Sequence, residues 1–146
     1  MRETAMTDCT APTPFLTPAY RLWLDRAAPA TIGTIATGGL RRITTMRDGH
    51  LSGDGLDARL VSGSETELTR ANGLTIVEAS YVLDCGGTLL RAFGTGFRKS
   101  AEDFSGLRLS LLFEAAQDGP LAHLATRAFV AEQADGDDTL SIHRID

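Results

Sequence analysis

The segment 74-LTIVEASYVLDCGGTLLRAFGTGFR-98 decides the fold of this chain. Apolar side chains recur at every second position from Val77 to Leu83, which is the period of a strand that turns one face to a core. Gly86-Gly87 is a two-residue hairpin signal, and residues 88–98 continue as another strand-like run. The segment therefore predicts two long antiparallel strands, at residues 74–84 and 88–98.

Similar runs extend outward from this hairpin in both directions. Asn72-Gly73 predicts the turn before it, and Pro18 indicates an edge position or a β-bulge in the first run. Turn residues recur about every ten positions, so we expect about eight to ten strands and an all-β barrel or sandwich. The other predicted strands are residues 15–24, 31–37, 40–46, 56–61, 65–70, 107–115, 121–133 and 139–145.

One stretch also has a helical alternative. Residues 113–124 are rich in Ala and Leu. Gly119-Pro120 interrupts them, so two strands flanking a turn are favoured over a helix.

A single domain fits the length of 146 residues. Residues 1–14, rich in Thr, Pro and Ala, read as a flexible tail, and residues 15–146 as one β-barrel domain. The tail has no apolar core of the kind found in secretory signals, and no apolar run reaches the ~20 residues that a membrane-spanning helix needs. The two cysteines, Cys9 and Cys85, fit a reducing compartment. We therefore expect a cytoplasmic protein without a membrane partner.

Charge and motif content exclude several classes of function. The formal net charge is -5 and Lys99 is the only lysine, so there is no basic stripe for nucleic acid. The histidines are scattered, and no CxxC or HExxH motif occurs. We expect neither a metal nor an organic cofactor.

Carboxylate and phenol side chains in the predicted strands could carry chemistry. Glu65 follows a glycine turn and shares one strand face with Glu67 and Thr69. A carboxylate in a barrel interior can act as a general base or acid; the alternative is a solvated group at the rim. Tyr81 and Glu78 lie on opposite faces of one strand, so without a bulge only one of them points inward. We favour Tyr81, whose hydroxyl could donate to a carbonyl or phenolate oxygen.

Arginines could bind an anionic substrate in the interior. Arg41 and Arg42 face opposite ways on a strand, so at most one reaches the interior. Arg91, in the middle of an apolar run, raises the same question. The alternative for each arginine is an outer salt bridge. The other substrate-binding candidates are His50, His123 and Trp23.

Several short motifs resemble a known family. GLRRI (39–43), DGHLSG (48–53), SGSET (62–66), RANG (70–73) and VEASY (77–81) follow one another in an order and spacing that resemble the bacterial and fungal family called domain of unknown function 3237. Phe113 and residues 121–129 are similar to the end of its pattern.

The resemblance implies a small antiparallel β-barrel with a central cavity, similar in plan to dirigent and allene-oxide-cyclase barrels. A barrel of about eight strands can hold one small ligand. Dirigent-type proteins tend to form homo-oligomers, so one is implied here. In this chain Glu65 and Glu78 stand where the family has Asp, Thr66 where it has an aromatic residue, and His123 where it has Trp. These departures indicate a reshaped pocket that keeps its acidic groups.

Two function classes follow. The first is a cofactor-independent lyase or isomerase that acts on a small aromatic or phenolic molecule by acid–base proton transfer, as in decarboxylation, dehydration or retro-aldol cleavage. Glu65, Tyr81 and Arg42 would be its catalytic residues, and Arg41, Glu78, Arg91, His123, His50 and Trp23 would bind the substrate. The alternative is a non-catalytic barrel that binds or guides the same kind of ligand.

Overall fold

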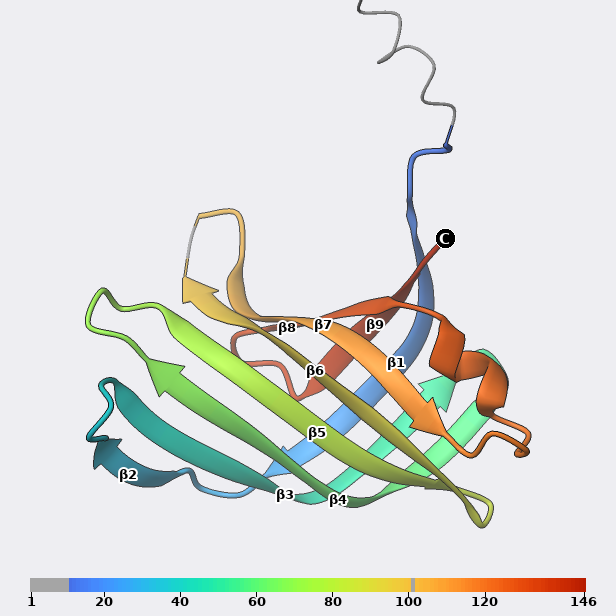
Figure 1. Ribbon diagram of the computed structural model, residues 1–146, viewed down its shortest axis with the longest axis horizontal. Helices are drawn as coiled ribbons and strands as arrows, with labels where there is room; N and C mark the ends of the chain where they lie inside the picture. Colours follow the sequence, from blue (N-terminus) through green and yellow to red (C-terminus); the bar gives the residue numbers. More distant parts are fainter. Residues whose placement is uncertain (1–10, 101) are drawn as a thin grey trace, which may run out of the picture.

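Eight antiparallel strands close into a barrel (Figure 1). They follow one another around the wall in the order β1, β9, β8, β7, β6, β5, β4 and β3, and β3 pairs back with β1. The short β2 adds to the free part of β3. This computed structural model describes residues 11–100 and 102–146, so most of the predicted tail, 1–14, lies outside it. The predicted all-β antiparallel barrel is confirmed.

The strands of the described residues are β1 (Leu16–Arg26), β2 (Ala30–Thr34), β3 (Leu40–Gly53), β4 (Leu56–Thr69), β5 (Thr75–Cys85), β6 (Thr88–Ser100), β7 (Ser105–Ala115), β8 (Phe129–Ala134) and β9 (Thr139–Ile145). The one helical element among them is a 3₁₀ turn, η1 (Ala122–Thr126). Pro18 lies at a β-bulge between β1 and β9, as its position in the first run predicts.

Apolar side chains fill the barrel toward η1. The rings of Tyr20, Phe113 and Phe129 contact one another with centroids 4.9 to 6.1 Å apart. Leu124 of η1 belongs to the same buried cluster. In Figure 1, η1 lies at the opposite end of the barrel from β2. We call these the η1 end and the β2 end. The residues of η1 cover the η1 end.

Two predicted strand breaks are wrong. Asp48-Gly49 lies inside β3 and Ser62-Gly63-Ser64 inside β4, so both strands are longer than expected. Gly49 and Gly63 do not form turns; each lets residues of a neighbouring strand approach its own strand closely. A Cβ on Gly49 would lie 2.9 Å from the carbonyl oxygen of Trp23, and one on Gly63 would lie 3.1 Å from the Tyr81 ring.

The predicted strand 121–133 is also corrected. Its first part forms η1, and only Phe129–Ala134 is a strand. Leu121 and Leu124 turn inward to cover the η1 end. That burial requires a compact turn. Alternation of polar and apolar residues indicates strands, so it could not predict this turn.

Gly94 and Gly96 allow β6 and β7 to approach closely. A Cβ on Gly94 would lie within 1.8 Å of the Ser110 carbonyl oxygen, and one on Gly96 equally close to that of Arg108. Only glycine fits at these two positions of β6.

Candidate functional site

The side chains of Glu65 and Tyr81 contact each other in the interior of the barrel. Glu65 pairs across β4 and β5 with Ala79, and Gly63 pairs with Tyr81, so Glu65 and Tyr81 project from the same face. Both side chains are buried, with 1% and 0% of their surface exposed. The Tyr81 hydroxyl donates a hydrogen bond of 2.5 Å to Oε2 of Glu65.

Arg26 completes this group from the last position of β1. Its Nε donates to Oε1 of Glu65 at 2.9 Å and its Nη2 donates to Oε2 at 2.8 Å. This two-point pairing is the strongest arrangement of a guanidinium on a carboxylate. The arginine side chain is 23% exposed, whereas that of Glu65 is only 1% exposed. Solvent therefore reaches the group through Arg26.

Gln133, at the end of β8, holds Arg26 in place. Nη2 of Arg26 also donates to Oε1 of Gln133 at 2.6 Å, and the Gln133 amide donates to the carbonyl oxygen of Asp137. The group thus joins β1, the hairpin of β4 and β5, and β8, three parts of the wall that are far apart in sequence.

The electrostatics of the group keep the Tyr81 phenol neutral. Burial, followed by the charge and hydrogen bond of Glu65, raises the pKa of Tyr81 well above its ordinary value of 10.0. Burial by itself would lower the pKa of Arg26, but the hydrogen bond and charge of Glu65 outweigh it and raise that pKa. Tyr81 therefore keeps its proton near neutral pH and acts as a hydrogen-bond donor.

A second ion pair lies next to the first, toward the β2 end. Glu67 follows two positions after Glu65 on the same face of β4, and Nη2 of Arg98 in β6 is 3.1 Å from its Oε2. Arg42 is the cross-strand neighbour of Glu67, on the face that also carries buried Thr44. Of the two adjacent arginines, Arg42 is thus the one that faces the interior, and Arg41 faces out.

The other predicted substrate-binding residues do not join this group. Glu78 is exposed on the outer wall, where Arg91 bonds to Ser80 and Glu114 and lies over the Phe93 ring. Glu78 and Arg91 both line one outer pocket of about 440 Å³.

Two histidines and the tryptophan are also dispersed. His50 lies 2.6 Å from Asp57 on the outer wall, and the indole of Trp23 donates to Asp138. His123 is exposed on η1, at the other end of the barrel from Glu67.

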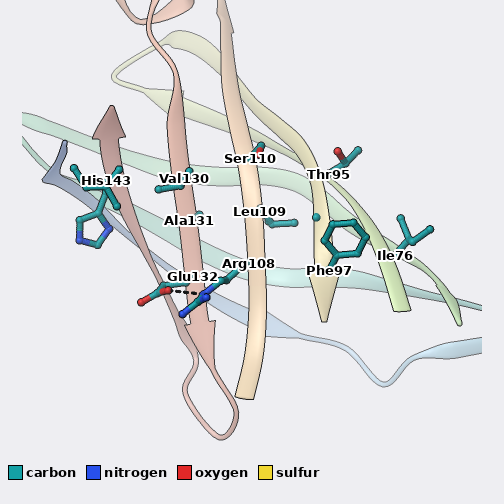
Figure 2. Close-up of a pocket in the computed structure, with 12 residues that line it drawn as sticks. Ile76, Thr95, Phe97, Arg108, Leu109, Ser110, Val130, Ala131, Glu132 and His143 are labelled. Atoms are coloured by element: carbon teal, nitrogen blue, oxygen red, sulfur yellow. Dashed lines mark hydrogen bonds and ion pairs between the residues drawn. The ribbon is translucent and has the colours of Figure 1, made fainter. Parts of the chain in front are cut away.

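A larger pocket of about 650 Å³ also lies on the outer wall, over β5 to β9 (Figure 2). Ile76, Phe97 and Val130 line it, and an Arg108–Glu132 ion pair borders it. None of the predicted site residues lines this pocket. Arg26, Glu65 and Tyr81 line neither of these two outer pockets. The central cavity stays a prediction.

Arg26 and Gln133 are the site residues that sequence reasoning missed. Arg26 lies beyond the first predicted strand, residues 15–24, although the inward series Leu22, Leu24 continues to it. Gln133 likewise continues the buried series Phe129, Ala131 in β8. A polar residue that extends an apolar alternation was the available signal in both cases.

Within residues 11–100 and 102–146, no three His, Cys, Asp or Glu side chains are grouped to hold a metal ion. The same residues contain no helix long and apolar enough to cross a membrane.

A family model matches residues 14–142. The chain belongs to the DUF3237 family. This family is described as proteins of unknown function, and no curated protein sequence matches the chain.

Solved structures share the DUF3237 barrel. A "beta-barrel like protein" from Acinetobacter baumannii has a TM-score of 0.83 at 19% identity, covering 95% of this chain and 100% of its own. A protein of unknown function from Rhodopseudomonas palustris has a TM-score of 0.78 at 19% identity, covering 92% and 99%. A protein described as an enzyme from Penicillium herquei has a TM-score of 0.74 at 15% identity, covering 94% and 98%. At these identities the likeness shows the fold alone.

Proposed function

We propose that this DUF3237 protein is a cofactor-independent lyase or isomerase that moves a proton on a small aromatic or phenolic molecule. The observation that carries the proposal is the buried Glu65 carboxylate, bound at once by the Tyr81 hydroxyl and the Arg26 guanidinium. Charged groups in a water-poor site act more strongly than in water. The description of one structurally similar protein as an enzyme also favours catalysis over carriage.

Glu65 is the candidate base. A carboxylate can accept about four hydrogen bonds, and Glu65 accepts three from the described residues. Oε2 receives two of them and Oε1 only one, so Oε1 keeps a lone pair for an acidic proton of the substrate.

Arg26 and Tyr81 would stabilise the charge left on the substrate. When a C–H proton moves to Oε1 of Glu65, its electron pair becomes an enolate or phenolate. The guanidinium of Arg26 and the hydroxyl of Tyr81 then bind that oxygen. In a dehydration, the C–O bond breaks next, and the proton on Glu65 leaves with the hydroxide as water. No step needs an electron acceptor.

The test begins with a thermal-shift screen of phenolic acids and stilbene-like compounds. Each ligand found is then incubated with the protein, and products are followed by chromatography and NMR. Glu65→Gln should lower turnover about 10²- to 10⁴-fold, the usual contribution of a general acid or base. Glu132→Gln, on the outer wall, is the matched control and should keep full turnover.

A ligand that binds with no product formed by the wild-type protein would favour the non-catalytic binding barrel instead. Full turnover by Glu65→Gln would contradict the role of Glu65. We also retain a cytoplasmic location and a homo-oligomer as proposals, the second open to light scattering.

A further inference from the structure

Among the described residues, the charged side chains that face the interior around Glu65 and Glu67 do not balance. Arg26, Arg42 and Arg98 stand against the two carboxylates of Glu65 and Glu67, which leaves one positive charge in excess. The whole chain carries a formal net charge of -5. This local excess is therefore opposite in sign to the charge of the protein.

Arg42 is the unpaired member. Arg26 is paired with Glu65, and Arg98 with Glu67. No ion pair or hydrogen bond of the Arg42 side chain is found among the described residues, although the residue is half-buried beside Glu67. Arg41 is also half-buried and without a partner among the described residues, so what distinguishes Arg42 is its direction: its guanidinium faces the interior with donors free for an anion.

Arg26 also keeps donor capacity. Its Nε and Nη2 are occupied by Glu65 and Gln133, while no acceptor for Nη1 is found in the part of the chain that the structure describes. Glu65 and Glu67 are two positions apart on β4, so the Arg26 and Arg42 layers are separated by about 7 Å along the strand. One small molecule can contact both layers.

Acidic residues of the nearby turn after β8 have other partners. The Asp137 carboxylate accepts from the Thr139 backbone, and that of Asp138 accepts from Trp23 and Thr139. These contacts do not neutralise Arg42.

We propose that the ligand of this site is a small organic monoanion, a carboxylate or a phenolate, whose negative oxygen binds Arg42 and Nη1 of Arg26. The proposal rests on the proposed function, because it names the substrate class of the same site. It adds that a neutral phenol or ester of the same shape is a poor ligand.

Calorimetric titration with matched probes tests this class. Benzoate should bind and the neutral benzamide should not; 4-nitrophenolate, at a pH where it is ionised, reports on the phenolate arm. Binding of benzoate alone assigns a carboxylate, and binding of 4-nitrophenolate alone assigns a phenolate. Equal binding of benzamide, or no binding of either anion at millimolar concentration, would overturn the proposal.

The adjacent arginines supply a matched pair of variants. Arg42→Gln should weaken anion binding about 10- to 100-fold, the scale of a lost hydrogen bond to a charged group. Arg41→Gln removes the same charge from the outward face and should leave the affinity unchanged. Equal losses in both variants, or none in either, would contradict a specific role of Arg42. The melting temperature of ligand-free Arg42→Gln should not fall, because the wild-type guanidinium has no partner to lose.

This experiment separates two failures. If anions bind through Arg42 but Glu65→Gln does not affect turnover, the catalytic role of Glu65 is wrong and the ligand class stands. If turnover depends on Glu65 while neutral analogues bind as well as anions, the ligand class is wrong and the catalytic proposal stands.

Discussion

The hydroxyl of Tyr81 lies 2.5 Å from Oε2 of Glu65, diagonally across β4 and β5. The contact is possible because Gly63, the direct neighbour of Tyr81 on β4, has no side chain to displace the ring. A short bond of this kind between a neutral donor and a carboxylate is stronger than one between two neutral groups.

Tyr81→Phe should therefore destabilise the protein by about 1.5–3 kcal/mol, the range for a hydrogen bond to a charged group. Denaturant unfolding should show a lower midpoint and an unchanged slope. Tyr20→Phe is the control: Tyr20 is also buried, but no hydrogen bond of its hydroxyl is found among the described residues. If both variants lose the same stability, the Tyr81–Glu65 bond contributes nothing of its own.

The Arg26–Glu65 pair should show strong coupling in a double-mutant cycle. Arg26→Met leaves a buried carboxylate without its counter-ion, at a cost of about 3–5 kcal/mol. The double variant Arg26→Met/Glu65→Met should cost much less than the sum of the single changes. The exposed pair Arg108–Glu132 is the control, with an expected coupling of about 0–1 kcal/mol. Additive costs at Arg26 and Glu65 would contradict the pairing.

Gly94→Ala and Gly96→Ala should each destabilise the barrel by about 3 kcal/mol or more, because the new methyl group meets a backbone carbonyl of β7. Gly119→Ala is the matched control, since its Cβ would meet nothing closer than 3.4 Å; its effect should stay within about 0.5 kcal/mol. Thermal unfolding compares the three variants. Native stability of Gly94→Ala would mean that β6 and β7 are further apart than described.

Alkaline pH should unfold the protein rather than titrate Tyr81 in place. The pKa of Tyr81 is raised in the folded state, so the unfolded chain loses this proton first. Stability is therefore full below about pH 10, the unfolded value, and falls as the pH rises above it. Tyrosinate absorbance and far-ultraviolet circular dichroism should change together. Ionisation of both tyrosines near pH 10 in a protein that stays folded would contradict a raised pKa.

The sequence predicted the wall of the barrel better than its ends. The strand 139–145 agrees with β9, and the central hairpin 74–98 with β5 and β6, because alternation and turn residues mark them. The strand breaks predicted at Gly49 and Gly63 were wrong because glycine occurs both in turns and where two strands approach closely. Only the position of the neighbouring strand distinguishes the two cases. Residues 122–126 form η1 because Leu124 packs over the apolar interior at that end of the barrel.

The candidate site was only partly accessible to sequence reasoning. Glu65 could be selected because it is an acidic residue at the start of a predicted strand, and Tyr81 because it is a polar residue within an apolar alternation. The same alternation placed Tyr81 and Glu78 on opposite faces of their strand. Whether Arg41 or Arg42 faces inward depends on the register between β3 and β4, which no single strand contains. Arg26 and Gln133 reach Glu65 from β1 and β8, so their proximity depends on barrel closure.

That closure has a consequence for the order of folding. From β3 to β9 every strand lies beside its neighbour in sequence, so these seven can form as a meander from local contacts. β1 is the exception, since it is enclosed between β3 and β9 and cannot be paired on both sides until β9 has been made. Arg26 arrives with β1. Until β1 pairs with β3 and β9, Glu65 has no counter-ion. The Arg26–Glu65 ion pair therefore forms only when the barrel closes.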